Sequence, residues 1–284
     1  MSIRSVLVPI LPQCEPAPML NAGLQLARRF GGHLDALFIR PDPADAFAAI
    51  PNFALAERVT LEEVEEAGRQ LGRAAHERFE HWRAATMLID GMPPAGTAVP
   101  TTWCERVGAI ETELPDRGRL SDLIVLHYPT HHVHGSERLF TAATFSTGRP
   151  VLLVRHAIAH DLLNHVLIAW NGGLEATRAV AAAMPLLEAA KSVTVFTAPM
   201  HGGAPECGVS LGDALARHGI QSQQTWAHRN DPDVGASLLR AASERGASLI
   251  VMGAQNHSRL LTALFGGVTR HVLKEGGLAV LMAH

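Results

Sequence analysis

The sequence of 284 residues is poor in cysteine, in aromatic residues and in long apolar runs. Its three cysteines, Cys14, Cys104 and Cys207, stand alone, and no two have the C-x-x-C spacing of a zinc or redox site. We therefore expect no disulfide framework, and this usage fits a reducing compartment. The longer apolar runs, such as residues 179–187, fall well short of the roughly 20 residues that a membrane helix needs.

The sequence also lacks the charge patterns and motifs of several functional classes. Basic and acidic residues number 24 and 27, and no basic run is present, so nucleic-acid binding is not expected. Neither a Walker A sequence nor G-x-G-x-x-G occurs, which gives no support for a P-loop ATPase, a kinase or a dinucleotide dehydrogenase. Residues 1–16 have no long apolar segment with a small-residue cleavage site. We expect a soluble cytoplasmic protein without a membrane partner.

Short apolar runs, by contrast, are plentiful and alternate with helical segments. Runs such as Ser5–Ile10 and Leu249–Met252 predict buried strands, and the longest helical segment, 53–82, has apolar residues at intervals of three and four. This alternation predicts an α/β fold with a parallel sheet covered by helices. The predicted strands are 5–10, 33–39, 98–104, 122–126, 150–154, 165–170, 192–197, 221–227, 249–252 and 278–282. The predicted helices are 16–31, 53–82, 107–120, 138–147, 175–190, 210–218, 232–245 and a last one that opens at Gly266 and Gly267.

The pattern of strands runs through the chain twice. Residues 121–126 (SDLIVL) match 247–252 (ASLIVM), and 151–156 (VLLVRH) resemble 280–284 (VLMAH) with one residue fewer. An internal repeat of this length predicts two domains, which we place at residues 1–157 and 158–284.

The stretch from Leu249 to Leu273 carries the clearest chemical signal. A buried strand leads to Gly253, a polar loop follows, and Gly266 and Gly267 open a helix. Free backbone N–H groups and the dipole at a helix N-terminus favour an anion such as phosphate. The stretch therefore predicts an anion site where the strand ends.

Two five-stranded repeats, each ending in a PVLLV-type strand, resemble a tandem universal stress protein. The resemblance covers nearly the whole chain and is stronger in the second half, where residues 169–179 (AWNGGLEATRA) are similar to the family's first strand and turn. Residues 253–272 are similar to its signature of a glycine, two residues, a second glycine, nine residues and then Gly-Ser or Gly-Thr.

The resemblance implies two tandem Rossmann-like domains of the adenine nucleotide alpha hydrolase-like type. Each would be a five-stranded parallel sheet of order 3-2-1-4-5 flanked by helices, with its ligand site beyond the carboxyl ends of strands 1 and 4. In members that bind nucleotides, an aspartate after strand 1 orients the adenosine and the glycines hold the phosphates, so ATP, AMP or another small anion is the implied ligand. The last strands of the repeats would pair, joining Val151–Val154 to Ala279–Met282, and a homodimer is also compatible.

Three positions of the second half depart from the family pattern. Asn171 stands where the aspartate is expected, Asn256 replaces the middle glycine, and Gly267 replaces the terminal serine or threonine. Asparagine tolerates a left-handed backbone, but its side chain would crowd a phosphate. Charge toward an anion would come from His257, Arg259 and Arg270. The candidate binding residues are Ala169, Asn171, Met252, Gly253, Asn256, His257, Gly266, Gly267, Val268 and Thr269.

In the first half the corresponding segments predict no site. Residues 8–13 (VPILPQ) contain no acid, and 127–135 (HYPTHHVHG) replace the glycine turn, with Pro129 where a backbone donor is needed. The histidines of that loop, His131, His132 and His134 with His127 upstream, are spaced for a zinc or nickel site. No nearby Cys, Asp or Glu completes a ligand set, so we expect no metal there.

Two further patterns resemble catalytic motifs, and for both we favour a structural interpretation. Gly208, Ser210 and Gly212 fit G-x-S-x-G, but a loop precedes them where the hydrolase motif needs a strand, so we interpret Ser210 as a helix N-cap. His76 and His81 approximate a metalloprotease motif, yet a spacing of five residues turns them away from a common helix face.

We therefore expect a non-enzymatic stress-response protein that works as a small-ligand or partner-binding module. Its adenine-nucleotide or anion site, in the second half, is degenerate and is expected to be weak or absent, the turn being kept for the fold. One alternative is a purely structural or interaction protein that acts through its surface and the long helix. The other is a weak ATPase with Thr269 and Arg259 near the phosphates.

Overall fold

The computed structural model describes residues 2–48, 59–89, 99–130, 132–156, 161–197, 206–227, 233–254 and 267–284. Contacts divide the chain into two compact units, Ile3–Thr147 and Gly148–His284, with the first two residues assigned to the second unit. No helix in the described part of the chain is both long and apolar enough to cross a membrane.

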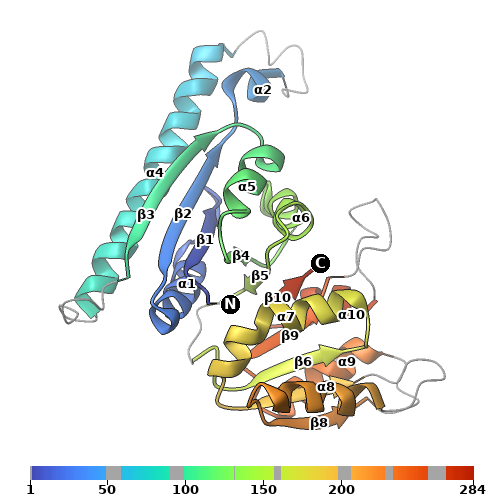
Figure 1. The fold of residues 1–284 in the computed structure, drawn as a ribbon. Coiled ribbons are helices and arrows are strands. Elements are labelled where there is room, and N and C mark those ends of the chain that lie inside the picture. Colours follow the sequence, from blue (N-terminus) through green and yellow to red (C-terminus); the bar gives the residue numbers. More distant parts are fainter. Residues whose placement is uncertain are drawn as a thin grey trace. The chain divides into compact units, whose positions relative to one another are not determined.

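The first unit is a parallel sheet of strand order β3-β2-β1-β4 with helices on both faces. Figure 1 shows α4 on one face and α5 with α6 on the other. Its strands are β1 (Ser5–Ile10), β2 (His33–Arg40), β3 (Thr101–Val107) and β4 (Leu123–His127). Its helices are α1 (Ala17–Phe30), α2 (Pro43–Ala48), α4 (Leu61–Ile89), α5 (Ile110–Gly118) and α6 (Ser136–Ser146).

The second unit contains a complete repeat, whose strand order β8-β7-β6-β9-β10 is the predicted 3-2-1-4-5 order. The α/β fold class is thereby confirmed. The strands of this unit are β5 (Val151–Val154), β6 (Val166–Trp170), β7 (Val193–Thr197), β8 (Ser222–Trp226), β9 (Leu249–Gly253) and β10 (Ala279–Ala283). Its helices are α7 (Leu174–Ala189), α8 (Glu206–Arg217), α9 (Val234–Glu244) and α10 (Gly267–Glu275).

The last strand of the first repeat, β5, belongs to the second unit by its contacts. It pairs antiparallel with β10, Leu153 opposite Val280 and Val151 opposite Met282, which confirms the predicted pairing of the two closing strands. Just after β5, the Arg155 guanidinium donates to the Leu273 carbonyl at 2.8 Å, at the end of α10. The predicted boundary at 157/158 adjoins residues outside the described part and stays a prediction.

The core explains why the central strands were recognisable in the sequence. All residues of β5 and β10 and nearly all of β1 are buried, so these strands form continuous apolar runs. The edge strands β3 (TTWCERV) and β8 (SQQTW) are half-exposed and polar. Because β6 and β9 pair in parallel, their carboxyl ends lie next to each other, where a ligand site is expected.

Several predicted elements differ in extent. The long helix, predicted to end at residue 82, runs to Ile89, and the helix predicted from residue 210 begins at Glu206. The long helix, predicted from residue 53, begins at Leu61 because Thr60 and Glu63 form a capping box: the Glu63 carboxylate accepts from the Thr60 amide at 2.7 Å, and the Thr60 hydroxyl accepts from the Glu63 amide at 3.2 Å. Strand β3, predicted at 98–104, lies three residues further along, because Thr101 pairs with Leu34 and Val107 with Arg40. The helix predicted at 107–120 is accordingly shorter, at Ile110–Gly118.

Candidate functional site

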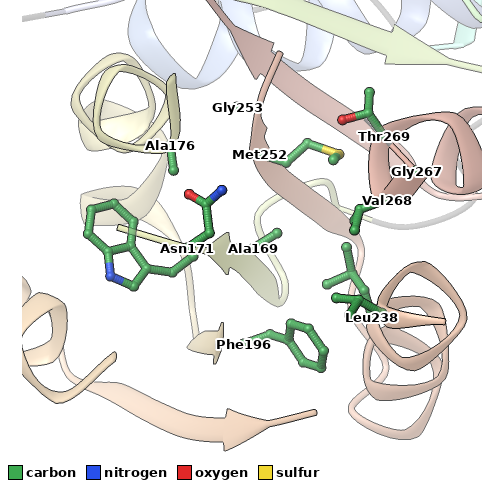
Figure 2. A pocket seen from close by; sticks show the side chains of 12 residues that line it. Ala169, Asn171, Ala176, Phe196, Leu238, Met252, Gly253, Gly267, Val268 and Thr269 are labelled. Atoms are coloured by element: carbon green, nitrogen blue, oxygen red, sulfur yellow. The ribbon is translucent and has the colours of Figure 1, made fainter. Parts of the chain in front are cut away.

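A pocket lies in the second unit beyond the carboxyl ends of β6, β7 and β9 and against α9 and α10 (Figure 2). Seven of the ten predicted binding residues line it: Ala169, Asn171, Met252, Gly253, Gly267, Val268 and Thr269. The other three, Asn256, His257 and Gly266, lie outside the described residues. The fold therefore brings together residues that are up to 100 positions apart in the sequence.

Five lining residues were not predicted: Trp170, Ala176, Phe196, Val234 and Leu238. Phe196 could have been found, since it lies at the carboxyl end of a predicted strand next to strand 1 of the repeat. Val234 and Leu238 come from α9, whose position against the pocket no local pattern indicates. Sequence motifs locate the turn residues, whereas the apolar wall follows from packing.

Asn171 begins the turn between β6 and α7. Its Oδ1 accepts the backbone N–H of Gly173 at 2.9 Å, and Gly172 between them has φ +73°, a left-handed conformation that suits glycine. Helix α7 then starts at Leu174, with the Gly173 carbonyl accepting from the Thr177 amide and hydroxyl, both at 3.0 Å. Asn171 thus forms an Asx turn, one end of its carboxamide bound to the backbone.

Gly253 has a packing reason to be glycine. A Cβ at this position would lie 2.6 Å from the backbone nitrogen of Ala176 and 2.6 Å from the backbone carbon of Glu175. The end of β9 therefore passes directly against the first turn of α7. The first glycine of the signature is accounted for by this contact, whether or not a ligand binds.

Gly267 differs, since no described atom lies within 4 Å of a Cβ added there. It is the first residue of α10, and no acidic side chain occupies the first turn of that helix to offset its dipole. The hydroxyl of Thr269, in the same turn, makes no hydrogen bond to another described residue, and Figure 2 shows it on the side of Met252 and Gly253. This corner of the pocket offers backbone and hydroxyl donors.

The rest of the pocket is apolar and uncharged. None of the described lining residues is ionisable, and Asn171 and Thr269, with the Trp170 indole, supply its polar side-chain groups. The volume is about 140 Å³, comparable with the roughly 150 Å³ cavity that admits benzene. A flat ring fits between such walls.

Asp233 links α9 to α10 in the pocket wall through a close contact with His271. Asp233 caps α9, its Oδ1 accepting from the Ala236 amide at 3.0 Å, and its Oδ2 lies 3.0 Å from Nδ1 of His271 on α10. The helices approach closely because Gly235 has no side chain, and a Cβ there would lie 2.6 Å from the His271 Cβ.

The corresponding place in the first unit is filled. Val6 pairs with Leu123 as Val166 pairs with Leu249, so Leu11 occupies the position of Asn171. The Leu11 and Ile110 side chains lie 3.6 Å and 3.4 Å from a Cβ added at Gly135, the residue that precedes α6. Apolar side chains therefore lie against the start of α6, whereas no described side chain lies this close to Gly267 at the start of α10.

A side chain of helix α4 also holds the loop after β1. Arg78 of α4 donates to the Pro12 carbonyl at 2.6 Å and to the Cys14 carbonyl at 3.3 Å. Tyr128, after β4, is 1% exposed. The loop after β1 is thus bound to a side chain of the protein itself.

The remaining sequence candidates do not form sites among the described residues. No group of three His, Cys, Asp or Glu residues there could hold a metal ion, and His131 lies outside the described part. Gly208 and Ser210 lie inside α8, which begins at Glu206, so Ser210 neither follows a strand nor caps a helix, and its predicted N-cap role is wrong. His76 stacks on Trp103 with ring centroids 5.0 Å apart, while His81 is exposed.

Comparison with known proteins supports the family suggested by the sequence. The universal stress protein family matches residues 163–284, which include every residue of the pocket. Among curated proteins, the sequence matches none.

Solved structures with the same fold extend over both repeats. A universal stress protein from Archaeoglobus fulgidus DSM 4304 superposes with a TM-score of 0.70 at 11% identity, covering 98% of this chain and 95% of that one. A functionally unknown protein from Pseudomonas aeruginosa PAO1 superposes with a TM-score of 0.58 at 16% identity, covering 99% and 92%. At these identities the likeness establishes the fold. Residues 163–284 therefore form a domain of the universal stress protein family, within a chain that has the two-repeat fold of such a protein.

Proposed function

We propose that this chain is a non-enzymatic stress-response module that binds an adenine nucleotide or another small anion in the pocket of its second repeat. The observation that supports this best is the difference between the repeats. No described atom lies within 4 Å of a Cβ added at Gly267, at the start of α10, whereas Leu11 and Ile110 lie against the start of α6. A protein that needed only the fold would have no reason to keep one of the two places open.

A binding role accounts for the lining better than a catalytic one. Acid–base chemistry needs a titratable group within hydrogen-bond reach of the reacting atoms, and none of the described lining residues is ionisable. The open start of α10 and the Thr269 hydroxyl supply donors for an anion. The apolar walls from Phe196 and Leu238 suit a flat ring.

The direct test is to identify what the purified protein carries and what it takes up. Mass spectrometry of material released on denaturation should detect a nucleotide or a related anion, and ATP or AMP at millimolar concentration should raise the melting temperature. Gly267→Glu should abolish the shift by placing a carboxylate in the pocket. Gly277→Glu is the matched control, because Gly277 is exposed with nothing within 4 Å and lies outside the pocket. No released ligand and no shift would reject the proposal.

The test also separates the two other functions suggested by the sequence. A purely structural or interaction protein predicts that Gly267→Glu leaves the cellular stress phenotype unchanged. A weak ATPase that uses Thr269 predicts phosphate release faster than in the Gly267→Glu control. We expect neither outcome.

A further inference from the structure

The orientation of the Asn171 carboxamide is fixed by the turn that it forms. Its Oδ1 accepts the Gly173 N–H at 2.9 Å. Reversing the amide would set the Nδ2 hydrogens against the Gly173 N–H, donor against donor, so this orientation is the one that satisfies both groups. Oδ1 therefore belongs to the turn, and Nδ2, which can only donate, is the polar group that Asn171 offers to a ligand.

Asn171 also stands apart from the anion corner. Figure 2 shows it beside Ala169 and Ala176, across the pocket from Val268 and Gly267. A ligand whose anionic end lies at the start of α10 would bring its other end to Asn171. The neighbouring walls there are apolar, so the ligand atom that faces Nδ2 has little else among the described side chains to bond with.

From this geometry we infer that Asn171 determines specificity by requiring a hydrogen-bond acceptor from the ligand. The chemical class is a flat heterocycle that turns a ring nitrogen or a carbonyl oxygen toward Nδ2. An aspartate in the same turn would accept the Gly173 N–H with one carboxylate oxygen and present the other oxygen to the ligand as an acceptor. It would therefore favour a ligand that donates a hydrogen bond from a hydroxyl or an amino group. Asn171 has the opposite preference, because its Nδ2 donates a hydrogen bond and so favours a ligand acceptor. This inference rests on the proposed function, because it concerns the same pocket.

The test compares the wild type with Asn171→Asp and Asn171→Ala, using adenosine and AMP as probes in ligand-observed NMR titrations. Asn171→Asp preserves the size of the side chain and the acceptor for the Gly173 N–H, so the turn remains. We expect the dissociation constant for adenosine to rise about fivefold in Asn171→Ala and tenfold or more in Asn171→Asp, where acceptor faces acceptor. Adenosine carries no phosphate, so charge repulsion does not produce this order, and AMP should follow it.

The alternative outcomes are distinct. Adenosine binding to Asn171→Asp as tightly as to the wild type, or more tightly, would mean that the ligand presents a donor and would overturn the inference while leaving the pocket functional. Equal affinity in all three proteins would overturn it as well. If the wild type binds neither adenosine nor AMP at millimolar concentration, both the proposed function and the inference about Asn171 are rejected. Unchanged denaturation midpoints of the variants exclude misfolding as the cause.

Discussion

At the scale of single residues, the glycines of the signature do different things. Gly253 is required by the chain itself, since the first turn of α7 occupies the space that its side chain would need. Gly267 is not required in this way, and its bare backbone opens toward the pocket. A glycine pattern taken from the sequence therefore mixes a packing constraint with a binding feature, and only the contacts around each glycine separate them.

This distinction predicts opposite effects of the same substitution. Gly253→Ala should destabilise the protein by about 1–3 kcal/mol, because backbone atoms 2.6 Å from the new Cβ cannot move aside as a flexible side chain can. Gly267→Ala should be neutral or slightly stabilising, since alanine favours a helix more than glycine does. Urea denaturation of both variants measures the difference, and equal effects would contradict this account of Gly253.

His165 gives a prediction about pH. Burial lowers the pKa of His165 from its ordinary value of 6.5, and the charge of Arg245 lowers it further, while its Nε2 lies 2.9 Å from the Thr194 hydroxyl. Because the folded state favours the neutral ring, the stability that this residue contributes is fully present above pH 6.5 and is lost as pH falls through the lower, folded pKa.

The measurement is the free energy of unfolding between pH 7 and pH 5. The glutamine of His165→Gln can still hydrogen-bond Thr194. The free energy of unfolding of this variant should fall less between pH 7 and pH 5 than that of the wild type. His132→Gln changes an exposed histidine and serves as the control, with the wild-type slope expected. A wild-type slope in His165→Gln would show that other groups govern the acid response.

At the scale of elements, the sequence predicts best those strands and helices whose position depends on local chemistry. The central strands form apolar runs because both of their faces are buried, and β1 lies within its predicted bounds. Edge strand β3 was misplaced by three residues because its position depends on pairing with β2, which no local pattern specifies. The start of α4 lies at the Thr60 and Glu63 capping box, which is visible in the sequence, whereas apolar periodicity alone places the start of the helix at residue 53.

The residues of the candidate site also fall into those that the sequence predicts and those that only the fold reveals. Asn171, Gly253 and Gly267 belong to turns, and turns leave a signature in the sequence. Phe196 and Leu238 enter the pocket through the packing of β7 and α9, so their part in it follows from the fold and from no motif.

Helix α4 is tied to the loop after β1 by one side chain, which gives a prediction at this scale. Arg78→Met should destabilise the protein by about 1–3 kcal/mol, since two backbone carbonyls, of Pro12 and Cys14, lose a charged donor. Arg73→Met on the same helix is the control, because the Arg73 side chain is 65% exposed and its contact with Glu66 is long, at 3.6 Å. Thermal or urea denaturation compares the two, and equal losses would refute a special role for Arg78.

At the scale of the whole molecule, the repeat in the sequence and the compact units do not coincide. The first repeat ends with β5, yet β5 pairs with β10 and its neighbour Arg155 bonds to the carbonyl of Leu273 in the second unit. Fusion of two repeats in one chain therefore lets the first supply the strand that covers the outer edge of the second. The family match, which begins at residue 163, omits this strand.

Two fragments test this arrangement. Residues 148–284 contain β5 and should fold, whereas residues 163–284 leave the ladder edge of β10 unpaired, with its apolar residues uncovered. Loss of the four buried side chains of β5 should lower the stability by on the order of 3 kcal/mol or more. An exposed apolar edge of this kind also favours self-association. Circular dichroism during urea titration and light scattering after gel filtration measure both effects; equal midpoints and equal masses per chain would mean that β5 is dispensable to the second unit.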